Sequence, residues 1–263
     1  MRLEGKKIIV TGGAGGIGGG TVRCCVKEGA QVAIVDWADE RGLALEAEAN
    51  GLAQGSGSAK YYHCDISRGS EVFPAFEEII NDMGGLDVLA HLAARDDLHK
   101  QPEDWTEEEM NGYWAVNLNG TILTNQAAFK QFKKMRKGVI INYASDTGLC
   151  GSPVQGVYSA SKGGVLAWTR SIANSPWARE YNIRSNSVCP QIMTPLYQCY
   201  IDSLEGEAKE KFIASRKISY PIDGWPGDAD RDAGPVMVFL ASEDSRYING
   251  QIISINGGSQ ITR

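Results

Sequence analysis

The chain has 263 residues, of which 43% are hydrophobic and 22% are charged, and its formal net charge is −6. This balance suits one α/β domain, and the negative charge argues against nucleic acid and anionic membranes as partners. We find no apolar run near the ~20 residues of a transmembrane helix and no signal-peptide pattern, so we expect a cytoplasmic protein. The six cysteines form no Cys-x-x-Cys pair and no cluster with the three histidines, so we expect no metal.

The first segment has the pattern of a βαβ unit. An apolar run at 7–10 leads into the glycine-rich stretch Thr11–Gly18, a helical pattern at 19–28, and a strand at 31–35 that ends at Asp36. This order is typical of a dinucleotide-binding site, with the pyrophosphate on the helix N-terminus. A plain turn is the alternative for the glycines, and the flanking strands and the acid favour the binding site.

Asp36 also predicts which dinucleotide is bound. Its carboxylate can accept hydrogen bonds from the adenosine ribose hydroxyls and would repel a 2′-phosphate. No Arg or Lys lies in the glycine loop, and Trp37-Ala38-Asp39-Glu40 follows the acid. The sequence therefore predicts NAD(H) rather than NADP(H).

Strands and helices continue to alternate through the first half. Helical patterns cover 41–53, 70–82 and 105–135, with a break expected near 111–112 in the last, and strands are expected at 60–64 and 87–92. Asp65 follows the third strand, and two interpretations stay open: it faces the adenine, or it caps the next helix. Asn117 lies inside a helical pattern, where Asn is mildly unfavourable, which indicates a polar role.

Residues suited to acid–base chemistry follow the fifth strand, at 139–141. Ser145 lies where this strand ends, and Tyr158 and Lys162 are four residues apart on the next helix, so they share one face. A nearby ammonium lowers the pKa of a phenol, which can then exchange a proton with an alcohol or carbonyl oxygen. An unremarkable surface helix is the alternative for the pair taken alone.

The remaining elements complete an α/β pattern. A sixth strand at 183–189 ends at Pro190, and a helix at 233–240 precedes a last strand at 251–255. We predict that the Tyr-, Pro- and Trp-rich stretch 191–227 forms one or two short mobile helices that cover the substrate, with a packing insertion as the alternative.

The alternation predicts a single Rossmann-type, doubly wound domain over 1–263, with a parallel sheet of about seven strands and helices on both faces. In such sheets ligands bind at the carboxyl ends of the strands. The residues expected to meet there are Thr11–Gly18, Asp36, Asp65, Ala93, Ser145 and Pro190.

A set of motifs also recurs in a known order. The set is Thr-Gly-x-x-x-Gly-x-Gly at Thr11–Gly18, Asp36, Asp65, Asn117, Ser145, Tyr158-x-x-x-Lys162, Asn186 to Pro190, and Asn256-Gly257-Gly258. With these residues the chain resembles the short-chain dehydrogenase/reductase family over almost its whole length. The resemblance implies that Tyr158 is the general acid/base and that Lys162 lowers its pKa and holds the nicotinamide ribose. It also implies that Ser145 holds the substrate oxygen, that Asn117 fixes a water of a proton relay, and that the protein is a homotetramer or homodimer.

The resemblance implies a site in which hydride passes between a carbinol carbon and NAD, with Thr194 at the carboxamide of the nicotinamide. The expected cofactor contacts are Gly12, Gly15, Gly16, Ile17, Gly18, Asp36, Trp37, Asp65, Ile66, Leu92, Ala93, Tyr158, Lys162, Pro190, Ile192 and Thr194. The expected substrate contacts are Ser145, Gln155, Gln191 and Tyr197, with Arg95, Asp96, Asp146, Cys150 and Trp225 as wider pocket candidates. A polyol, a hydroxylated ring and a steroid-like ketone all remain open as substrates.

We therefore expect an NAD(H)-dependent enzyme that interconverts a secondary alcohol and a ketone. The alternatives are a catalytically silent NAD-binding regulatory or structural module, and an enzyme of dehydration or epimerisation. Two segments depart from the family pattern. The usual Asn-Asn-Ala-Gly is His91-Leu92-Ala93-Ala94, so its side-chain bonds are lost or replaced by His91. The usual Pro-Gly is Pro190-Gln191, and Thr194 is one residue closer to the proline, so we expect a reshaped loop there.

Overall fold

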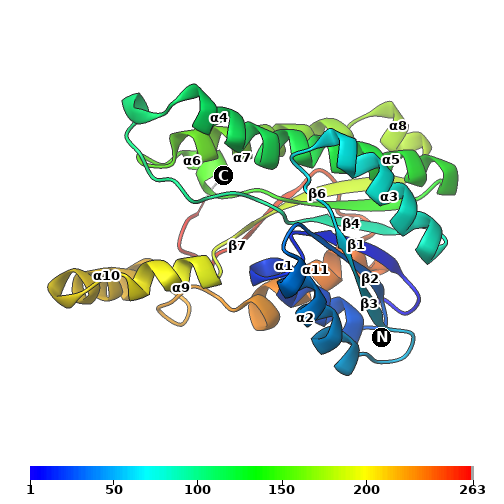
Figure 1. Ribbon diagram of the computed structural model, residues 1–263, viewed down its shortest axis with the longest axis horizontal. Coiled ribbons are helices and arrows are strands. Elements are labelled where there is room, and N and C mark those ends of the chain that lie inside the picture. The colour runs from blue at the N-terminus through cyan, green and yellow to red at the C-terminus, as the bar shows by residue number, and fades with distance from the viewer. Residues whose placement is uncertain (262–263) are drawn as a thin grey trace.

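A parallel sheet runs through the centre of the molecule, with helices on both of its faces (Figure 1). The computed structural model describes residues 1–261. The strands in these residues are β1 (Lys7–Thr11), β2 (Gln31–Asp36), β3 (Ser58–His63), β4 (Val88–His91), β5 (Gly138–Tyr143), β6 (Ile183–Pro190) and β7 (Ile252–Ile255). Their order in the sheet is β3-β2-β1-β4-β5-β6-β7, and every neighbouring pair is parallel. The predicted doubly wound fold is confirmed.

Helices connect the strands in the expected order. The α-helices are α1 (Gly16–Lys27), α2 (Asp39–Gly51), α3 (Gly69–Met83), α4 (Glu107–Tyr113), α5 (Thr121–Met135), α6 (Thr147–Cys150), α7 (Gly156–Ala173), α8 (Pro176–Glu180), α9 (Pro195–Asp202), α10 (Gly206–Ser219) and α11 (Gly234–Ala241). The 3-10 and π-helical segments are η1 (Pro102–Asp104), η2 (Trp114–Gly120), η3 (Ala229–Ala233) and η4 (Glu243–Ser245). None of the helices described is long and apolar enough to cross a bilayer.

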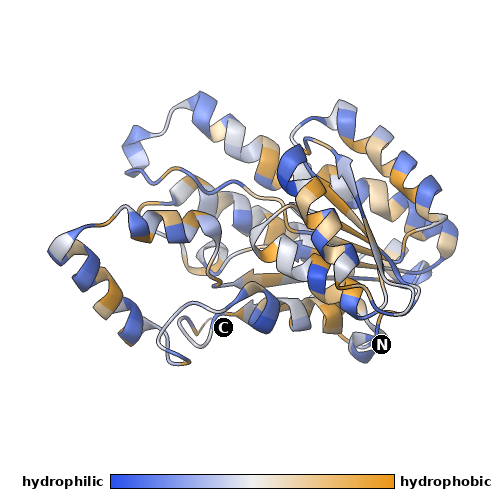
Figure 2. Cartoon of the chain, turned by 60° about the horizontal axis from the view of Figure 1, so that its bottom comes forward, coloured by the Kyte–Doolittle hydropathy of each residue, from blue (hydrophilic) through white to orange (hydrophobic). Residues whose placement is uncertain are grey.

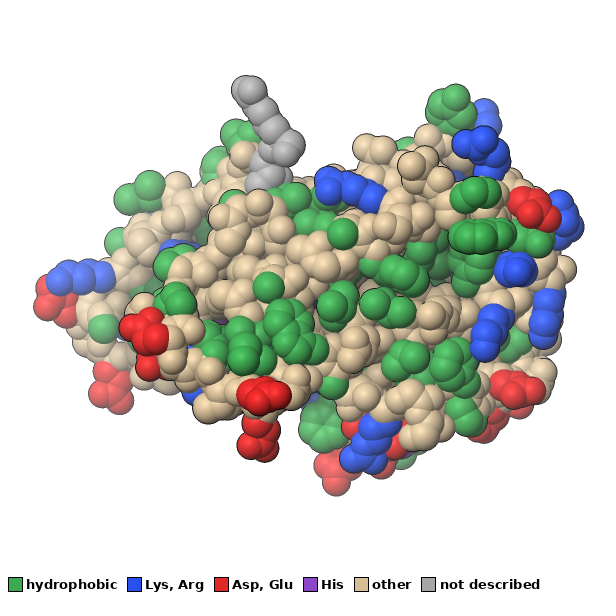
Figure 3. Space-filling model, turned by 90° about the horizontal axis from the view of Figure 1, so that it is seen from above, with side chains coloured by type: hydrophobic (Ala, Val, Ile, Leu, Met, Phe, Trp, Pro, Cys, Tyr) green, Lys and Arg blue, Asp and Glu red, His purple; other side chains and the backbone are tan. Residues whose placement is uncertain are grey.

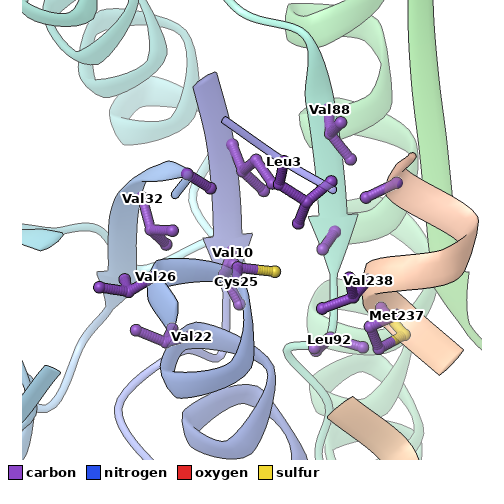
Figure 4. Close-up of a cluster of buried hydrophobic side chains, with 14 of the residues drawn as sticks. Leu3, Val10, Val22, Cys25, Val26, Val32, Val88, Leu92, Met237 and Val238 are labelled. Atoms are coloured by element: carbon purple, nitrogen blue, oxygen red, sulfur yellow. The ribbon is translucent and has the colours of Figure 1, made fainter. Parts of the chain in front are cut away.

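Two apolar layers hold these helices on the sheet. On one face α1 and α11 bury Val22, Val26 and Val238 against strand residues such as Val10 (Figure 4). On the other face α3, α5 and α7 bury a second group that includes Phe76, Ile79, Phe132 and Ile172. Each fully buried side chain of this size contributes about 1.5–3 kcal/mol. The strands are hydrophobic on both faces, while the helices turn polar residues outward (Figure 2), as a parallel sheet requires.

The helical pattern at 105–135 is interrupted at a different place from the one predicted. The helix begins at Glu107 because Thr106 and Glu109 form a capping box, and Trp105 lies outside it. The helix continues through 111–112, so the break expected there is wrong. A π-helical turn, η2, separates α4 from α5 instead, and it carries Asn117. Such turns are frequent at functional sites.

The stretch 191–227 contains two helices, as predicted. Phe212 of α10 packs edge-on against Tyr197 and Tyr200 of α9, with ring centroids 6.2 and 5.5 Å apart. The two helices extend outward from the body (Figure 1), and α10 buries no residue. The covering role of this stretch therefore stays a prediction.

Candidate active site

The glycine-rich loop lies at the switch point of the sheet, where β1 has β2 on one side and β4 on the other. Close backbone packing explains two of its glycines. A Cβ on Gly12 would lie 2.6 Å from the backbone of Ala93, and a Cβ on Gly18 would lie 2.0 Å from the carbonyl oxygen of Gly12. A Cβ on Gly16 would lie 3.7 Å from the Thr194 methyl, so the loops after β1, β4 and β6 converge here.

The N-terminus of α1 has the features of a pyrophosphate cradle. Its N-cap is Gly15, which supplies no side-chain cap, and the first turn carries no acidic residue. A Cβ on Gly15 would meet no atom of the described residues within 4 Å. Backbone N–H groups that no side chain caps, at the positive end of a 12-residue helix, suit a phosphate anion.

Asp36 is fixed beside this loop. Its Oδ2 accepts a hydrogen bond from the backbone N–H of Ala14, and its Oδ1 accepts one from Ala38, both at 3.1 Å. The indole of Trp37 is 69% exposed next to it. These positions fit an adenosine group bound beyond the end of β2.

Asp65 belongs to a turn before α3. Its Oδ1 accepts from the N–H and the hydroxyl of Ser67, at 3.0 and 2.7 Å. The N-cap of α3 is Arg68, so the cap interpretation of Asp65 is wrong, whereas its contact with adenine stays a prediction. Ile66 is buried in the α3/α5 layer.

His91 stands at the first asparagine position of the family pattern Asn-Asn-Ala-Gly, and its ring contacts three threonines. Its Nδ1 lies 2.9 Å from the hydroxyls of Thr11 and Thr124, and its Nε2 lies 3.0 Å from that of Thr121. Burial lowers the pKa of His91 to about 3, and the charge of Lys162 adds to the effect. His91 therefore joins β1, β4 and α5 as a neutral ring. The next residue, Leu92, is buried in the sheet core.

Tyr158 and Lys162 lie on the buried face of α7, with exposures of 3% and 1%. The Nζ of Lys162 donates to the carbonyl oxygen of Tyr143 at 2.9 Å, and it stands 5.6 Å from the ring centroid of Tyr158. Burial lowers the pKa of Lys162 to about 7, against the raising effect of Asp96. The two predicted side chains are thus together.

The pKa of Tyr158 is shifted in the opposite direction from the lowering expected from the sequence. Burial raises the pKa of Tyr158 well above its ordinary value, Tyr143 and Asp96 raise it further, and the Ser145 side chain lowers it. The expected lowering by Lys162 is not found, because desolvation dominates. The phenol is consequently protonated, which is the form that donates to a carbonyl oxygen.

Ser145 lies next to this pair at the end of β5. Its Oγ accepts from the N–H and the hydroxyl of Thr147, at 3.2 and 3.1 Å, so its own O–H is available to a substrate oxygen. The neighbouring Asp146 is not a pocket residue. Its buried carboxylate accepts from Ser254 and Asn256, each at 2.8 Å, and ties this loop to β7.

Asn117 holds the loop that follows β4. Its Oδ1 accepts from the N–H of Arg95 at 2.7 Å, and its Nδ2 donates to the Arg95 carbonyl at 2.9 Å and to the Ser161 hydroxyl at 3.2 Å. The side chain therefore anchors a wall of the site, a role that the sequence reasoning missed. The water relay assigned to Asn117 by resemblance stays a prediction.

The remaining predicted contacts fall into two groups. Gln155 donates to Asp96 on the α7 side of the site. Gln191 accepts from Tyr220 at 3.2 Å, Tyr197 packs in the α9/α10 pair, and Thr194 caps α9 through a bond from the Tyr197 N–H. Among residues 1–261, no hydrogen bond joins the side chains of this second group to those of Tyr158 or Ser145. Ile17 packs in a small apolar cluster with Ile192 and Ile255, and Pro190 ends β6.

Tyr143 is an active-site residue that the sequence reasoning missed. Its ring centroid lies 4.0 Å from the Nζ of Lys162, and its hydroxyl accepts from that of Tyr158 at 3.4 Å. A signal was present, because Tyr143 precedes Ser145 by two residues at the end of one strand and so shares its face.

Comparison with known proteins finds similar oxidoreductases over nearly the whole chain. The protein family described as "Enoyl-(Acyl carrier protein) reductase" matches residues 12–260. The chain is 35% identical over 266 residues to "3-oxoacyl-[acyl-carrier-protein] reductase FabG" of Thermotoga maritima, covering 98% of this chain and 99% of the relative. It is 30% identical over 260 residues to "2-(S)-hydroxypropyl-CoM dehydrogenase 3" of Xanthobacter autotrophicus, covering 98% and 97%.

Solved structures agree with these sequence matches. The structure of NAD+-bound xylitol dehydrogenase has a TM-score of 0.87 and 25% identity, with 98% of this chain and 100% of that chain covered.

Proposed function

The chain belongs to the short-chain dehydrogenase/reductase family, and we propose that it is an NAD(H)-dependent enzyme that interconverts a secondary alcohol and a ketone. The observation that carries this proposal is the group Ser145, Tyr158 and Lys162, buried at the sheet edge that also holds the glycine cradle. The names of its relatives support it, because a 3-oxoacyl group contains a ketone and a 2-hydroxypropyl group contains a secondary alcohol.

The residues present fit the cofactor. The pyrophosphate would rest on the N-terminus of α1, and the carboxylate of Asp36 would accept from the adenosine ribose hydroxyls. No Arg or Lys of Gly12–Gly18 or 37–40 would balance a 2′-phosphate, which supports NAD(H). Tyr158 and Lys162 would lie at the nicotinamide ribose, and Thr194 at the carboxamide. The nicotinamide ring supplies the chemistry of hydride exchange with the substrate carbon.

Side chains of the protein bind the substrate oxygen and exchange a proton with it. The Ser145 hydroxyl orients this oxygen, and the protonated Tyr158 donates to it when a ketone is reduced. In alcohol oxidation the phenolate takes the same proton, and a protonated Lys162 nearby favours that phenolate. General acid–base help of this kind contributes about 10²–10⁴ in rate. Asn117 keeps the adjoining loop in place and, by the proposed relay, connects Lys162 to solvent.

We also propose that the protein forms a homotetramer or homodimer. Hydrophobic side chains gather across the middle of one face, and charged side chains lie at its margins (Figure 3). A second copy of the chain would cover such a face. We propose further that α9 and α10 close over the substrate and that the protein is cytoplasmic.

The decisive experiment replaces the phenol. Tyr158→Phe is expected to lower kcat about 10²–10⁴-fold while NADH binding, followed by fluorescence, stays nearly unchanged. Tyr247→Phe, at a residue that is 93% exposed, is the control. A Tyr158→Phe variant with the kcat of the wild type would refute the mechanism.

The same assay tests the alternative of a silent NAD-binding module. The altered segment His91-Leu92-Ala93-Ala94 is the one sequence feature that favours that alternative, whereas Asn117, Ser145, Tyr158 and Lys162 are all retained, which argues against it. Turnover of secondary alcohols with NAD+ would exclude it. Comparable kcat/KM values with NAD+ and NADP+ would refute the cofactor proposal.

A further inference from the structure

The loop after β4 forms a rigid wall beside the catalytic group. Asn117 holds both backbone groups of Arg95, and the hydroxyl of Tyr113 accepts from the N–H groups of Asp97 and Leu98 at 3.0 and 2.8 Å. Further on, the N–H of residue 100 donates to the carbonyl of residue 154 at 2.8 Å, which joins this loop to the one before α7. Asp96 lies between these anchors, so its position is fixed.

Three polar side chains meet on this wall. The Nε2 of Gln155 donates to both carboxylate oxygens of Asp96, at 2.9 and 3.0 Å, and lies 3.1 Å from the Nε2 of His99. Gln155 is the N-cap of α7 and precedes Tyr158 by three residues, so the two lie on the same side of the helix. Leu98 of the loop after β4 packs against the apolar cluster that holds Tyr158, and Asn117 joins Arg95 to Ser161 of α7, so the segment that carries Asp96 lies against the catalytic end of this helix. In keeping with this, the charge of Asp96 raises the pKa of both Tyr158 and Lys162.

Arg95 and Lys100, the two cations on the same loop, are paired with other acids, while the Nε2 of His99 stands 3.7 Å from the Oδ1 of Asp96. Arg95 bonds Asp97 through Nε and Nη2, at 2.6 and 3.0 Å, and Lys100 bonds Glu109. The side chain of Asp96 is 33% exposed, so its carboxylate keeps acceptor capacity beside the amide of Gln155 and the imidazole of His99. A carboxylate has about four acceptor positions, so the Gln155 bonds do not exhaust it.

These groups favour one kind of substrate. An anionic substituent would be repelled by Asp96, and an apolar substituent would strip water from the carboxylate without replacing its bonds. A hydroxyl group would donate a charge-assisted hydrogen bond to Asp96 and could accept from His99.

We propose that Asp96, Gln155 and His99 form a subsite that binds a substrate hydroxyl on the carbon next to the reacting carbinol, so that the enzyme prefers vicinal diols and longer polyols. This inference rests on the proposed alcohol–ketone interconversion and names its substrate class. Simple secondary alcohols and hydroxy acids are then poor substrates, because the first lacks the donor and the second carries a negative charge.

Matched alcohols test the subsite. The kcat/KM for NAD+-dependent oxidation is measured with butane-2,3-diol, 2-butanol and 3-hydroxybutyrate, using each stereoisomer. We expect the best diol to exceed 2-butanol by about 10- to 100-fold, the range for one hydrogen bond to a charged group, and 3-hydroxybutyrate to be poorest.

Two variants test whether Asp96 on this wall causes the preference for the diol over 2-butanol. Asp96→Asn keeps the shape of the side chain but loses its charge, and it is expected to lower the diol to 2-butanol ratio about tenfold. Asp97→Asn is the matched control, because that acid pairs with Arg95 outside the cluster, and it is expected to keep the ratio. The ratio cancels any effect of Asp96 on Tyr158 that both alcohols share. A ratio near one in the wild type, or one unchanged by Asp96→Asn, overturns the subsite.

A binding measurement separates this inference from the proposed function. The affinities of the diol and of 2-butanol are measured by fluorescence and calorimetry, with and without NADH, in the wild type and in Asp96→Asn. If neither alcohol is oxidised but the diol binds in an Asp96-dependent manner, the oxidoreductase proposal fails and the subsite stands. Equal affinities for the two alcohols overturn the subsite whatever the turnover.

Discussion

The hydroxyl of Tyr143 lies 3.4 Å from the hydroxyl of Tyr158 and accepts its hydrogen bond. Because this bond favours the protonated phenol, it contributes to the raised pKa of Tyr158. We expect Tyr143→Phe to lower that pKa while keeping a ring over the Lys162 ammonium. The acid limb of the pH profile for alcohol oxidation, which needs the phenolate, should then move to lower pH.

The pH dependence of kcat/KM checks the direction of this bond. A shift of the acid limb to higher pH in Tyr143→Phe would contradict it, since Tyr143 would then be donating to the phenolate. Tyr143→Leu is the companion variant. It removes the ring as well, and the difference between the two variants isolates the contact with Lys162.

The charge of Asp36 is expected to decide the cofactor preference. Asp36→Asn keeps an oxygen that can accept one of the two bonds from Ala14 and Ala38, but it removes the repulsion of a 2′-phosphate. Coulomb energies at contact distance near a protein surface predict that the NADP+ to NAD+ ratio of kcat/KM rises about tenfold or more.

Asp39→Asn is the control for the cofactor prediction. Asp39 is an exposed acid at the start of α2 whose carboxylate accepts from Tyr61 and contacts His63, whereas the carboxylate of Asp36 accepts from Ala14 of the glycine loop. Steady-state kinetics with both dinucleotides measure the ratio. An unchanged ratio in Asp36→Asn, or an equal change in Asp39→Asn, would show that another residue selects the cofactor.

The elements that the sequence predicts well are those set by local pattern. Apolar strands, glycine turns and the Tyr158/Lys162 spacing depend on the periods of strand and helix, and each is found where expected. The π turn at Asn117 could not be predicted, because the helix pattern continues through it and its reason is tertiary. The Asn117 side chain reaches the backbone of Arg95, 22 residues away.

The contacts of Tyr143, which was missed, and of His91, which was expected only as a possible replacement for the lost asparagine bonds, depend on the fold for a related reason. A tyrosine at the end of a buried strand has an ordinary β propensity, and only the fold brings α7 against it. His91 stands where the family pattern has an asparagine, and its partners Thr11, Thr121 and Thr124 come from two other elements. The direction of α9 and α10 likewise has no local signal.

Acid is expected to destabilise the protein through His91. The pKa of His91 is lowered from 6.5 to about 3, so between these values the unfolded chain binds a proton that the folded chain excludes. The free energy of unfolding then falls with decreasing pH by up to about 1.4 kcal/mol per pH unit. His91→Asn should lose this part of the slope, although it is less stable at neutral pH.

Urea unfolding at several values between pH 7 and pH 5 measures the slope of His91→Asn against that of the wild type. His63→Asn, at an exposed histidine, serves as the control. Equal slopes in the wild type and His91→Asn would mean that the buried ring takes up a proton without cost.

The buried ammonium of Lys162 predicts the last effect, on stability at alkaline pH. Its pKa is lowered from 10.5 to about 7, so the unfolded chain binds one proton more than the folded chain between these values. The contribution of Lys162 to the free energy of unfolding therefore falls as the pH decreases from 10.5 to 7, by about 1.4 kcal/mol per unit. Lys162→Met carries no such cost. As the pH is lowered from 9 to 8, the stability of this variant relative to the wild type should rise by that amount, on top of a constant loss from the unpaired Tyr143 carbonyl.

Denaturant unfolding at pH 9 and pH 8 measures this change, with Lys211→Met, at a lysine that is 74% exposed, as the control. Buried thiols and phenols titrate at high pH in both proteins, so their contribution cancels when the two free energies of unfolding are subtracted. A relative stability that does not change with pH would mean that Lys162 keeps its charge in the folded protein, held by the carboxylate of Asp96.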